Sequence, residues 1–188
     1  MDIYLIRHTT PKVDKGICYG ATDLPVVKTF PDEAKAVKAV LPIYQPTTTV
    51  YSSPLVRCHQ LAQFIAPPQS IHVEPSFKEI SFGDWEMHPW KSIDKLVMKK
   101  WFENFVHISP PNGEAFQTVY DRTIKALERA KSNSQDQLWI VAHSGIIRAI
   151  LCYYQNIPLK DAFKANMEYG AVYKIDEETK EVSQLKEK

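Results

Sequence analysis

Short apolar runs alternate along the chain with longer stretches whose apolar residues recur at helical spacing. The short runs are rich in β-branched residues, which predicts strands over residues 2–7, 48–52, 71–74, 137–142 and 171–175. The helical spacing predicts helices over residues 29–41, 53–65, 91–105, 114–131 and 144–154. Strands that alternate with helices favour an α/β fold, a three-layer α/β/α sandwich with a mostly parallel sheet and helices on both faces.

Local signals mark where several of these elements begin and end. Thr29 precedes Pro31, and Ser53 precedes Pro54, so each hydroxyl is expected to cap a helix whose first turn holds the proline. The periodicity weakens over residues 75–111, where aromatic residues crowd into "FGDWEMHPW". We interpret this stretch as a small insertion over the edge of the sheet. Residues beyond 175 are expected to form a charged tail.

The size and charge of the chain restrict its class. A chain of 188 residues with 44% hydrophobic content is expected to form a single domain around one core, residues 1–188. Its 23 basic and 22 acidic residues give a net charge of +1, which argues against nucleic acid and membrane surfaces as partners. The expected partner is a small molecule, and the expected state is a monomer or homodimer.

The three cysteines are widely spaced along the chain. Cys18, Cys58 and Cys152 form no C-x-x-C pair and leave one thiol over, so neither a disulfide framework nor a zinc ribbon is expected. No apolar stretch is long enough for a signal peptide or a membrane span. These observations predict a cytoplasmic protein.

Polar groups follow three of the predicted strands. Arg7 and His8 end the first, the second leads through two serines to Arg57, and His143 and Ser144 follow the strand at 137–142. The carboxyl ends of parallel strands share one edge of a sheet, where ligands bind. This edge would then hold two arginines, two histidines and the start of a helix. Such a combination predicts a site for a phosphate group.

Each of these residues alone has a more ordinary explanation. Arg57 near a helix start is usually a surface charge, and a histidine such as His143 is usually a hydrogen-bonded structural side chain. Their conjunction at one edge favours function. A metal site is the chemical alternative, but the sequence has no H-E-x-x-H motif and no acidic cluster beside the histidines, so neither metal nor cofactor is expected.

Four motifs together resemble the histidine phosphatase superfamily, which has the phosphoglycerate mutase-like fold. They are "LIRH" at 5–8, "SSPLVRC" at 52–58, "EISFGDWE" at 79–86 and "VAHSG" at 141–145. More narrowly, "EISFGDWEMH" and "PPNGEAFQ" resemble bacterial α-ribazole phosphatases, which act in assembling the lower ligand of cobalamin. The resemblance implies that His8 is the nucleophile, that Arg7, Arg57 and His143 hold the phosphoryl oxygens, and that Glu79 donates the proton.

The first loop departs from the pattern of the family. Thr9 stands where glycine is usual, Pro11 takes the place of the hydroxyl residue, and Asp14 replaces asparagine, so Thr9 or Thr10 would have to supply the hydroxyl. Position alone leaves Asp84, Glu86 and Glu114 as rival acids to Glu79, although Glu114 has the position of a helix cap. The candidates for contacting substrate are Thr10, Asp14, Tyr19, Gly20, Trp85, Glu86, Asn112 and Ser144.

The sequence therefore predicts a metal-independent phosphomonoesterase that acts through a phosphohistidine on a small phosphorylated metabolite, with α-ribazole 5′-phosphate as the expected substrate. Trp85, Trp90, His88 and Phe116 are candidates for an aromatic substrate wall or, equally, for the core of the insertion. The alternatives are a phosphatase of another sugar or nucleoside phosphate, a mutase of the phosphoglycerate type, and a weakly catalytic protein that binds phosphate esters.

Overall fold

Side chains of the first strand, β1 (Asp2–Arg7), divide between two separate hydrophobic clusters. Ile3 and Leu5 belong to one cluster, and Tyr4 and Ile6 belong to the other. This division follows from the twofold alternation of a strand, whose successive side chains point to opposite faces of the sheet. The strand is therefore buried on both faces, as its unbroken apolar run predicts.

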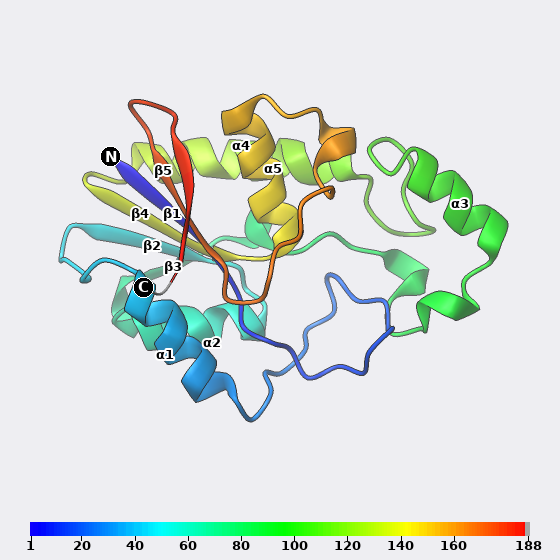
Figure 1. The fold of residues 1–188 in the computed structure, drawn as a ribbon, viewed down its shortest axis with the longest axis horizontal. Helices are drawn as coiled ribbons and strands as arrows, with labels where there is room; N and C mark the ends of the chain where they lie inside the picture. Colours follow the sequence, from blue (N-terminus) through cyan, green and yellow to red (C-terminus); the bar gives the residue numbers. More distant parts are fainter. Residues whose placement is uncertain (187–188) are drawn as a thin grey trace.

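The computed structural model describes residues 1–186 and contains six strands and five α-helices (Figure 1). The other strands are β2 (Thr48–Ser52), β3 (Ile71–Val73), β4 (Gln137–Ala142), β5 (Val172–Asp176) and β6 (Val182–Leu185). The helices are α1 (Phe30–Val40), α2 (Val56–Ile65), α3 (Lys95–Glu103), α4 (Phe116–Ser132) and α5 (Ser144–Gln155). Five short 3-10 turns lie at Pro68–Ser70, Pro75–Phe77, Gly83–Trp85, Trp90–Ser92 and Leu159–Asp161.

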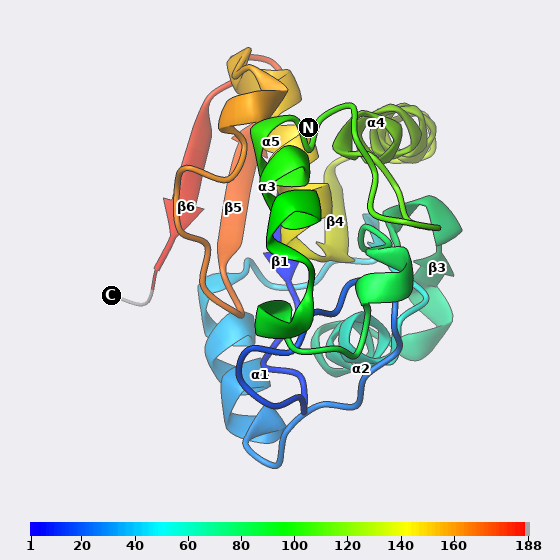
Figure 2. The ribbon, with the colours of Figure 1, turned by 90° about the vertical axis from the view of Figure 1, so that its right-hand side faces the viewer.

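The strands form one mixed sheet in the order β3-β2-β4-β1-β5-β6. The pairs among β3, β2, β4 and β1 are parallel, whereas β5 and β6 are antiparallel to their neighbours. Helices α1 and α2 cover one face of the sheet, and α4 and α5 cover the other (Figures 1 and 2). The predicted α/β architecture with a mostly parallel sheet is confirmed.

The register of the parallel strands fixes where their ends lie. Arg7 pairs with Ala142 of β4, and Ser52 of β2 pairs with Val141. Three strands therefore end level with one another, and the residues that follow them begin at one edge of the sheet. This alignment brings the residues that follow β1, β2 and β4 close together.

Helices α2 and α3 begin three or more residues later than the sequence predicts. Helix α2 begins at Val56 rather than at Ser53, because the preceding Leu55 has an extended backbone. The first helical N–H, that of Val56, donates to Oδ1 of Asp23 at 2.8 Å. Helix α3 begins at Lys95 rather than at 91, because a 3-10 turn precedes it and Asp94 caps it by accepting from two backbone N–H groups.

Two other helix starts differ in their capping. Helix α4 begins at Phe116 rather than at 114, and the Glu114 side chain is engaged elsewhere. At the start of α1 the Thr29 hydroxyl donates to Glu33 at 2.6 Å instead of accepting a backbone N–H.

The prediction of a charged tail after residue 175 is wrong for the residues that the structure describes. A turn in which Asp176 Oδ1 accepts from the N–H groups of Glu178 and Thr179 reverses the chain into β6. Lys180 adopts a positive φ of 62° at this turn, and Val182 then packs against the core. Six charged or polar residues in succession, 176–181, masked this turn in the sequence.

The stretch expected to be an insertion, residues 75–111, carries α3 and lies to one side of the sheet (Figure 1). Three tryptophans pack there against one another, Trp85 and Trp101 at 5.5 Å between ring centroids and Trp90 and Trp101 at 6.4 Å. This stretch therefore has an aromatic core of its own, together with Cys18 from the first loop. Over residues 1–186 no helix is both long and apolar enough to cross a membrane.

Candidate active site

His8 and His143 lie side by side at the level edge of the sheet. The His8 N–H continues the β1–β4 ladder by donating to the Ala142 carbonyl at 3.0 Å, so the residue that follows each strand meets its counterpart. The two imidazole rings are 5.0 Å apart between centroids. His8 is 2% exposed and His143 is fully buried.

Two contacts fix the tautomer of His8. Its Nδ1 lies 2.6 Å from the Thr9 carbonyl oxygen, which can only accept, so Nδ1 carries the proton. Its Nε2 lies 3.4 Å from Nε of Arg57, which can only donate, so Nε2 carries a lone pair. Burial and the positive charge of Arg57 hold the pKa of His8 well below its usual value of 6.5. The ring is therefore neutral, with a free nitrogen facing a cation.

Arg57 is fully buried and attaches the first loop to the site. Its Nη1 donates to the Thr22 carbonyl at 2.8 Å and its Nη2 to the Gly20 carbonyl at 2.6 Å. A buried guanidinium is stable only when its donors are paired, and the loop carbonyls provide those partners. The predicted residue Gly20 thus enters the site through its backbone.

Arg7 is held by the segment that precedes β5. Its Nη1 donates to the Met167 carbonyl, and its guanidinium carbon lies 4.1 Å from the centroid of the Tyr169 ring. The Tyr169 hydroxyl is hydrogen-bonded to that of Tyr19, and the Tyr169 ring lies 5.6 Å from that of His8. Tyr169 has no signal in the sequence, because it lies outside every predicted element. In the structure the following Gly170, with a positive φ of 71°, makes a tight connection there.

The neighbours of His143 come from the start of the second βα unit. Its Nε2 lies 2.8 Å from the Ser53 hydroxyl and 3.3 Å from Sγ of Cys58. Burial, followed by the electrostatic interaction with a protonated His8 and with the Arg57 cation, holds the pKa of His143 well below 6.5, because both interactions disfavour a second positive charge. Both histidines are therefore neutral near pH 7 in the folded protein.

Glu79 reaches the N-terminus of α5, the helix that follows His143. Its Oε2 accepts from the Gly145 N–H at 3.1 Å, and its Oε1 accepts from the N–H of Ile80 at 3.0 Å. The contact requires glycine, because a Cβ on Gly145 would lie 2.3 Å from Oε1 of Glu79. The sequence places both residues at the edge but gives no sign of this close approach.

The rival acids have other partners. Glu114 accepts from the Ser81 N–H at 3.0 Å and pairs with Arg122 at 2.9 Å. Glu86 accepts from three backbone N–H groups, those of Ala21, Thr22 and Phe82. Asp84 accepts from the exposed Asn112 side chain at 3.0 Å. Among the four acids, Glu79 is the one bonded to the helix that begins beside His143.

The remaining predicted residues lie in varied surroundings. The Thr10 N–H donates to Glu33 at 2.8 Å, Asp14 is exposed, and half-buried Ser144 opens α5. The Thr9 hydroxyl is buried without a hydrogen-bond partner. Of the candidates for an aromatic wall, Trp85 is 6% exposed and Phe116 is fully buried in the core, so Phe116 does not line a binding surface.

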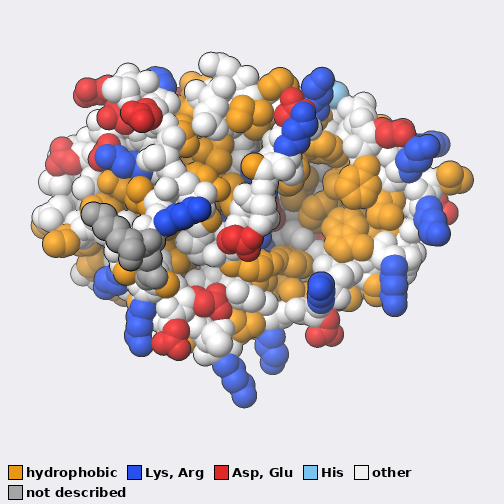
Figure 3. Space-filling model, viewed as in Figure 1, with side chains coloured by type: hydrophobic (Ala, Val, Ile, Leu, Met, Phe, Trp, Pro, Cys, Tyr) orange, Lys and Arg blue, Asp and Glu red, His pale blue; other side chains and the backbone are white. Residues whose placement is uncertain are grey.

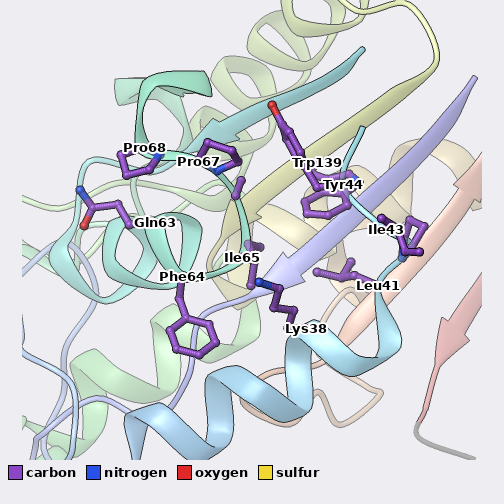
Figure 4. A pocket seen from close by; sticks show the side chains of 12 residues that line it. Lys38, Leu41, Ile43, Tyr44, Gln63, Phe64, Ile65, Pro67, Pro68 and Trp139 are labelled. Carbon is purple, nitrogen blue, oxygen red and sulfur yellow. The ribbon is translucent and has the colours of Figure 1, made fainter. Parts of the chain in front are cut away.

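The site concentrates positive charge without a matching set of acids. Arg7, Arg57 and two neutral histidines converge with a helix N-terminus, an arrangement that suits a phosphate dianion. Within residues 1–186, no three histidine, cysteine or acidic side chains gather as they would around a metal ion. A separate groove of about 600 Å³ lies beside α1 and α2 (Figure 4). Lys38, Tyr44, Phe64 and Trp139 are among its lining residues, and none of the predicted site residues lines it.

At the edge of this α/β sheet, a histidine with a free ring nitrogen therefore lies beside a buried arginine, next to a second arginine in the chain. A family profile of the histidine phosphatase superfamily (branch 1) matches residues 3–186. The chain belongs to this superfamily.

Individual relatives agree with this assignment. The adenosylcobalamin/alpha-ribazole phosphatase of Salmonella typhimurium is 26% identical over 183 residues, which cover 94% of this chain and 90% of that protein. The metal-independent phosphoserine phosphatase of Arabidopsis thaliana is 30% identical over 160 residues, 79% of this chain and 66% of that protein. The crystal structure of the alpha-ribazole phosphatase from Shigella flexneri shares the fold, with a TM-score of 0.86 at 23% identity over 100% of this chain and 96% of that one.

Proposed function

We propose that this chain is a cytoplasmic, metal-independent phosphomonoesterase that acts through a phosphohistidine on His8, with α-ribazole 5′-phosphate as its substrate. The observation that carries the proposal is the His8 tautomer: Nδ1 is fixed by the Thr9 carbonyl, and Nε2 keeps its lone pair beside Arg57. A neutral imidazole held in this way is a nucleophile suited to in-line attack on phosphorus.

In the first step Nε2 of His8 forms a bond to phosphorus while the bond from phosphorus to the ester oxygen breaks. The carboxyl group of Glu79 gives its proton to the leaving oxygen, which departs as an alcohol. Arg7, Arg57 and His143 stabilise the three equatorial oxygens, where the charge of the transition state is spread. Guanidinium groups provide here the positive charge that Mg²⁺ provides in kinases.

In the second step a water molecule attacks phosphorus and the bond to Nε2 breaks. Glu79, now a carboxylate, accepts a proton from that water, so the acid of the first step is the base of the second. Inorganic phosphate leaves, and His8 returns to its neutral tautomer. Each step balances without an external reductant, oxidant or metal ion.

The substrate assignment is supported by relatedness along nearly the whole chain. The Salmonella typhimurium relative named for alpha-ribazole aligns with 94% of this chain. The name of the Arabidopsis thaliana relative supports both metal independence and a second candidate, the phosphoserine class. The three cysteines are buried and free, which supports a reducing compartment.

The test is a screen of phosphomonoesters in the presence of EDTA, including α-ribazole 5′-phosphate, phosphoserine and 3-phosphoglycerate. Release of inorganic phosphate, fastest from α-ribazole 5′-phosphate, is the expected result. Rapid quenching with labelled substrate should trap a phosphoryl group that is labile in acid and stable in base. Transfer to another hydroxyl without release would identify a mutase, and binding without turnover would identify a phosphate-ester-binding protein.

A further inference from the structure

An apolar pocket lies beside the candidate active site and takes no part in the proposed chemistry. Its wall consists of Ile80, Phe82, Trp90, Trp101, Phe102, Phe105 and Phe163, and we call it the aromatic pocket. It encloses about 260 Å³, somewhat less than the roughly 300 Å³ at which pockets for drug-sized ligands begin. Its size suits one ring system.

The aromatic pocket presents rings in the arrangements that aromatic ligands join. Phe82 and Trp90 meet edge to face at 5.4 Å between centroids, and Phe105 and Phe163 do so at 5.4 Å. Aromatic pairs at such distances attract one another through the positive edge and the negative face of each ring. A planar ring entering the pocket would extend this network.

The pocket also leaves large apolar surface open to water. Phe102 is 59% exposed and Phe163 is 46% exposed. In Figure 3, hydrophobic side chains gather on the α3 side of the molecule beside a hollow in the surface. Exposed apolar surface that is clustered rather than scattered marks a binding site.

Three contacts connect the aromatic pocket to the catalytic groups. Ile80 directly follows Glu79 and donates its N–H to that carboxylate. Phe82 packs so closely on Gly20 that a Cβ there would lie 2.8 Å from its ring, and the Gly20 carbonyl accepts from Arg57.

The third contact is through Arg148. Its guanidinium carbon lies 5.0 Å from the centroid of the Phe163 ring. Arg148 lies on α5, the same helix whose Gly145 N–H donates to Glu79. Ile80 and helix α5 therefore both connect the aromatic pocket to Glu79, the proposed donor to the leaving oxygen.

We propose that the aromatic pocket binds an apolar aromatic ring in the alcohol part of the substrate, and so selects phosphomonoesters whose leaving group carries such a ring. The proposal rests on the proposed function, because it assigns the specificity of that same site. The phosphate is held by the arginines and the ring by Phe82, Phe102 and Phe163, with the ester oxygen between them at Glu79.

The test compares 2-phenylethyl phosphate with ethyl phosphate. Both leave as primary alkoxides, so they differ in the ring and not in the chemistry of bond breaking. The wild-type protein should have the higher kcat/KM for 2-phenylethyl phosphate by about tenfold or more, the size of effect that a few apolar atoms produce in a pocket. Phe102→Ala should remove most of that preference while leaving ethyl phosphate hydrolysis unchanged.

The matched control is Leu96→Ala on the same helix, because Leu96 is 73% exposed and lies outside the aromatic pocket. It should keep the wild-type preference. Equal kcat/KM for the two substrates in the wild-type protein would overturn the proposal. It would also be overturned if Phe102→Ala changed the oligomeric state and not the preference, since the pocket would then be a contact between copies.

A binding measurement separates this proposal from the proposed function. Titration with 2-phenylethanol should quench the tryptophan fluorescence of the wild-type protein, because Trp90 and Trp101 line the pocket, and ethanol should not. If no ester is hydrolysed, either here or in the screen that includes α-ribazole 5′-phosphate, the proposed function fails, and this titration alone decides whether the aromatic pocket binds a ring. Absence of quenching would then reject the aromatic pocket as a ligand site.

Discussion

The Nε of Arg57 lies 3.4 Å from Nε2 of His8, the ring nitrogen proposed to attack phosphorus. Once His8 carries a phosphoryl group, that nitrogen has no lone pair left to accept a hydrogen bond. The Arg57 N–H is then released and can turn to a phosphoryl oxygen. The same donor thus orients the nucleophile before reaction and stabilises the charge that develops during it, which is the differential binding that catalysis requires.

Replacing Arg57 by lysine should separate charge from geometry. Lysine keeps the positive charge but cannot donate at once to His8, Gly20 and Thr22, as the forked guanidinium does. We expect kcat/KM to fall by about 10²- to 10³-fold, the size of effect of removing one preorganised donor. Steady-state kinetics measure this loss. Arg129→Lys, at an exposed ion pair with Glu74, is the control and should be near wild type.

Replacing His8 by alanine should abolish turnover and preserve anion binding. The nucleophile is lost, so kcat should fall by on the order of 10⁴-fold or more, as in other enzymes that form a covalent intermediate. Arg7, Arg57 and His143 remain, so calorimetry should still detect inorganic phosphate. His107→Ala, at an exposed histidine, should behave as wild type in both assays. Substantial residual turnover in His8→Ala would remove His8 as the nucleophile.

Replacing Glu79 by glutamine should affect alkyl phosphates more than aryl phosphates. Alkoxides are poor leaving groups and need the proton, so their hydrolysis should fall by about 10²- to 10⁴-fold. A phenolate leaves unaided, so an aryl phosphate should give a burst of phenol followed by slow attack of water. Stopped-flow absorbance detects the burst. Equal losses on both classes with no burst would reject Glu79, and Glu86→Gln and Glu114→Gln would be tested next.

Replacing Gly145 by alanine should reproduce the Glu79 defect without unfolding the protein. The new Cβ would lie 2.3 Å from Oε1 of Glu79, at the end of a side chain that can rotate away. We expect a selective loss on alkyl phosphates together with a thermal midpoint close to that of wild type. Calorimetry and the alkyl-to-aryl rate ratio together check this. An unchanged ratio would show that the contact between Gly145 and Glu79 does not position the carboxylate.

Stability should fall as the pH drops below 6.5. His8 and His143 have pKa values well below 6.5 in the folded protein, whereas in the unfolded chain they take up protons near 6.5. The unfolded state therefore binds more protons in this range, so the free energy of unfolding is largest above 6.5 and declines on acidification towards the lowered pKa values. Urea unfolding at about pH 7.5 and about pH 5 measures the slope. His8→Asn should reduce it, and a flat profile in the wild-type protein would contradict the lowered pKa values.

Much of this arrangement could be predicted from local sequence, because strand periodicity and strand order together determine which residues meet. The unbroken apolar run before Arg7 indicates a strand buried on both faces, and the carboxyl ends of such strands gather at one edge. The meeting of His8 with His143 is thus a consequence of register.

Other features depend on contacts between distant segments and have no local signal. Tyr169 lies over Arg7 because the segment before β5 is antiparallel to β1, and the sequence does not show that β5 reverses direction. The cap that Asp23 gives to α2 joins residues 33 positions apart. Aromatic composition indicates that the insertion packs, but only the structure shows that Trp85 is buried in its core whereas Phe102 is open to water.

The order of the strands also determines which backbone edges of the sheet could pair with a strand from another copy of the chain. The sheet ends on one side at β3, three residues long, and on the other at β6, four residues long. Short edge strands are poor templates for the addition of a strand from another chain. Lys180 and Glu181 precede β6 and Lys186 follows it, so charge flanks the edge strand that is antiparallel to its neighbour. Edge-to-edge pairing of β6 with another copy should therefore be suppressed by the same β5–β6 hairpin that completes the sheet.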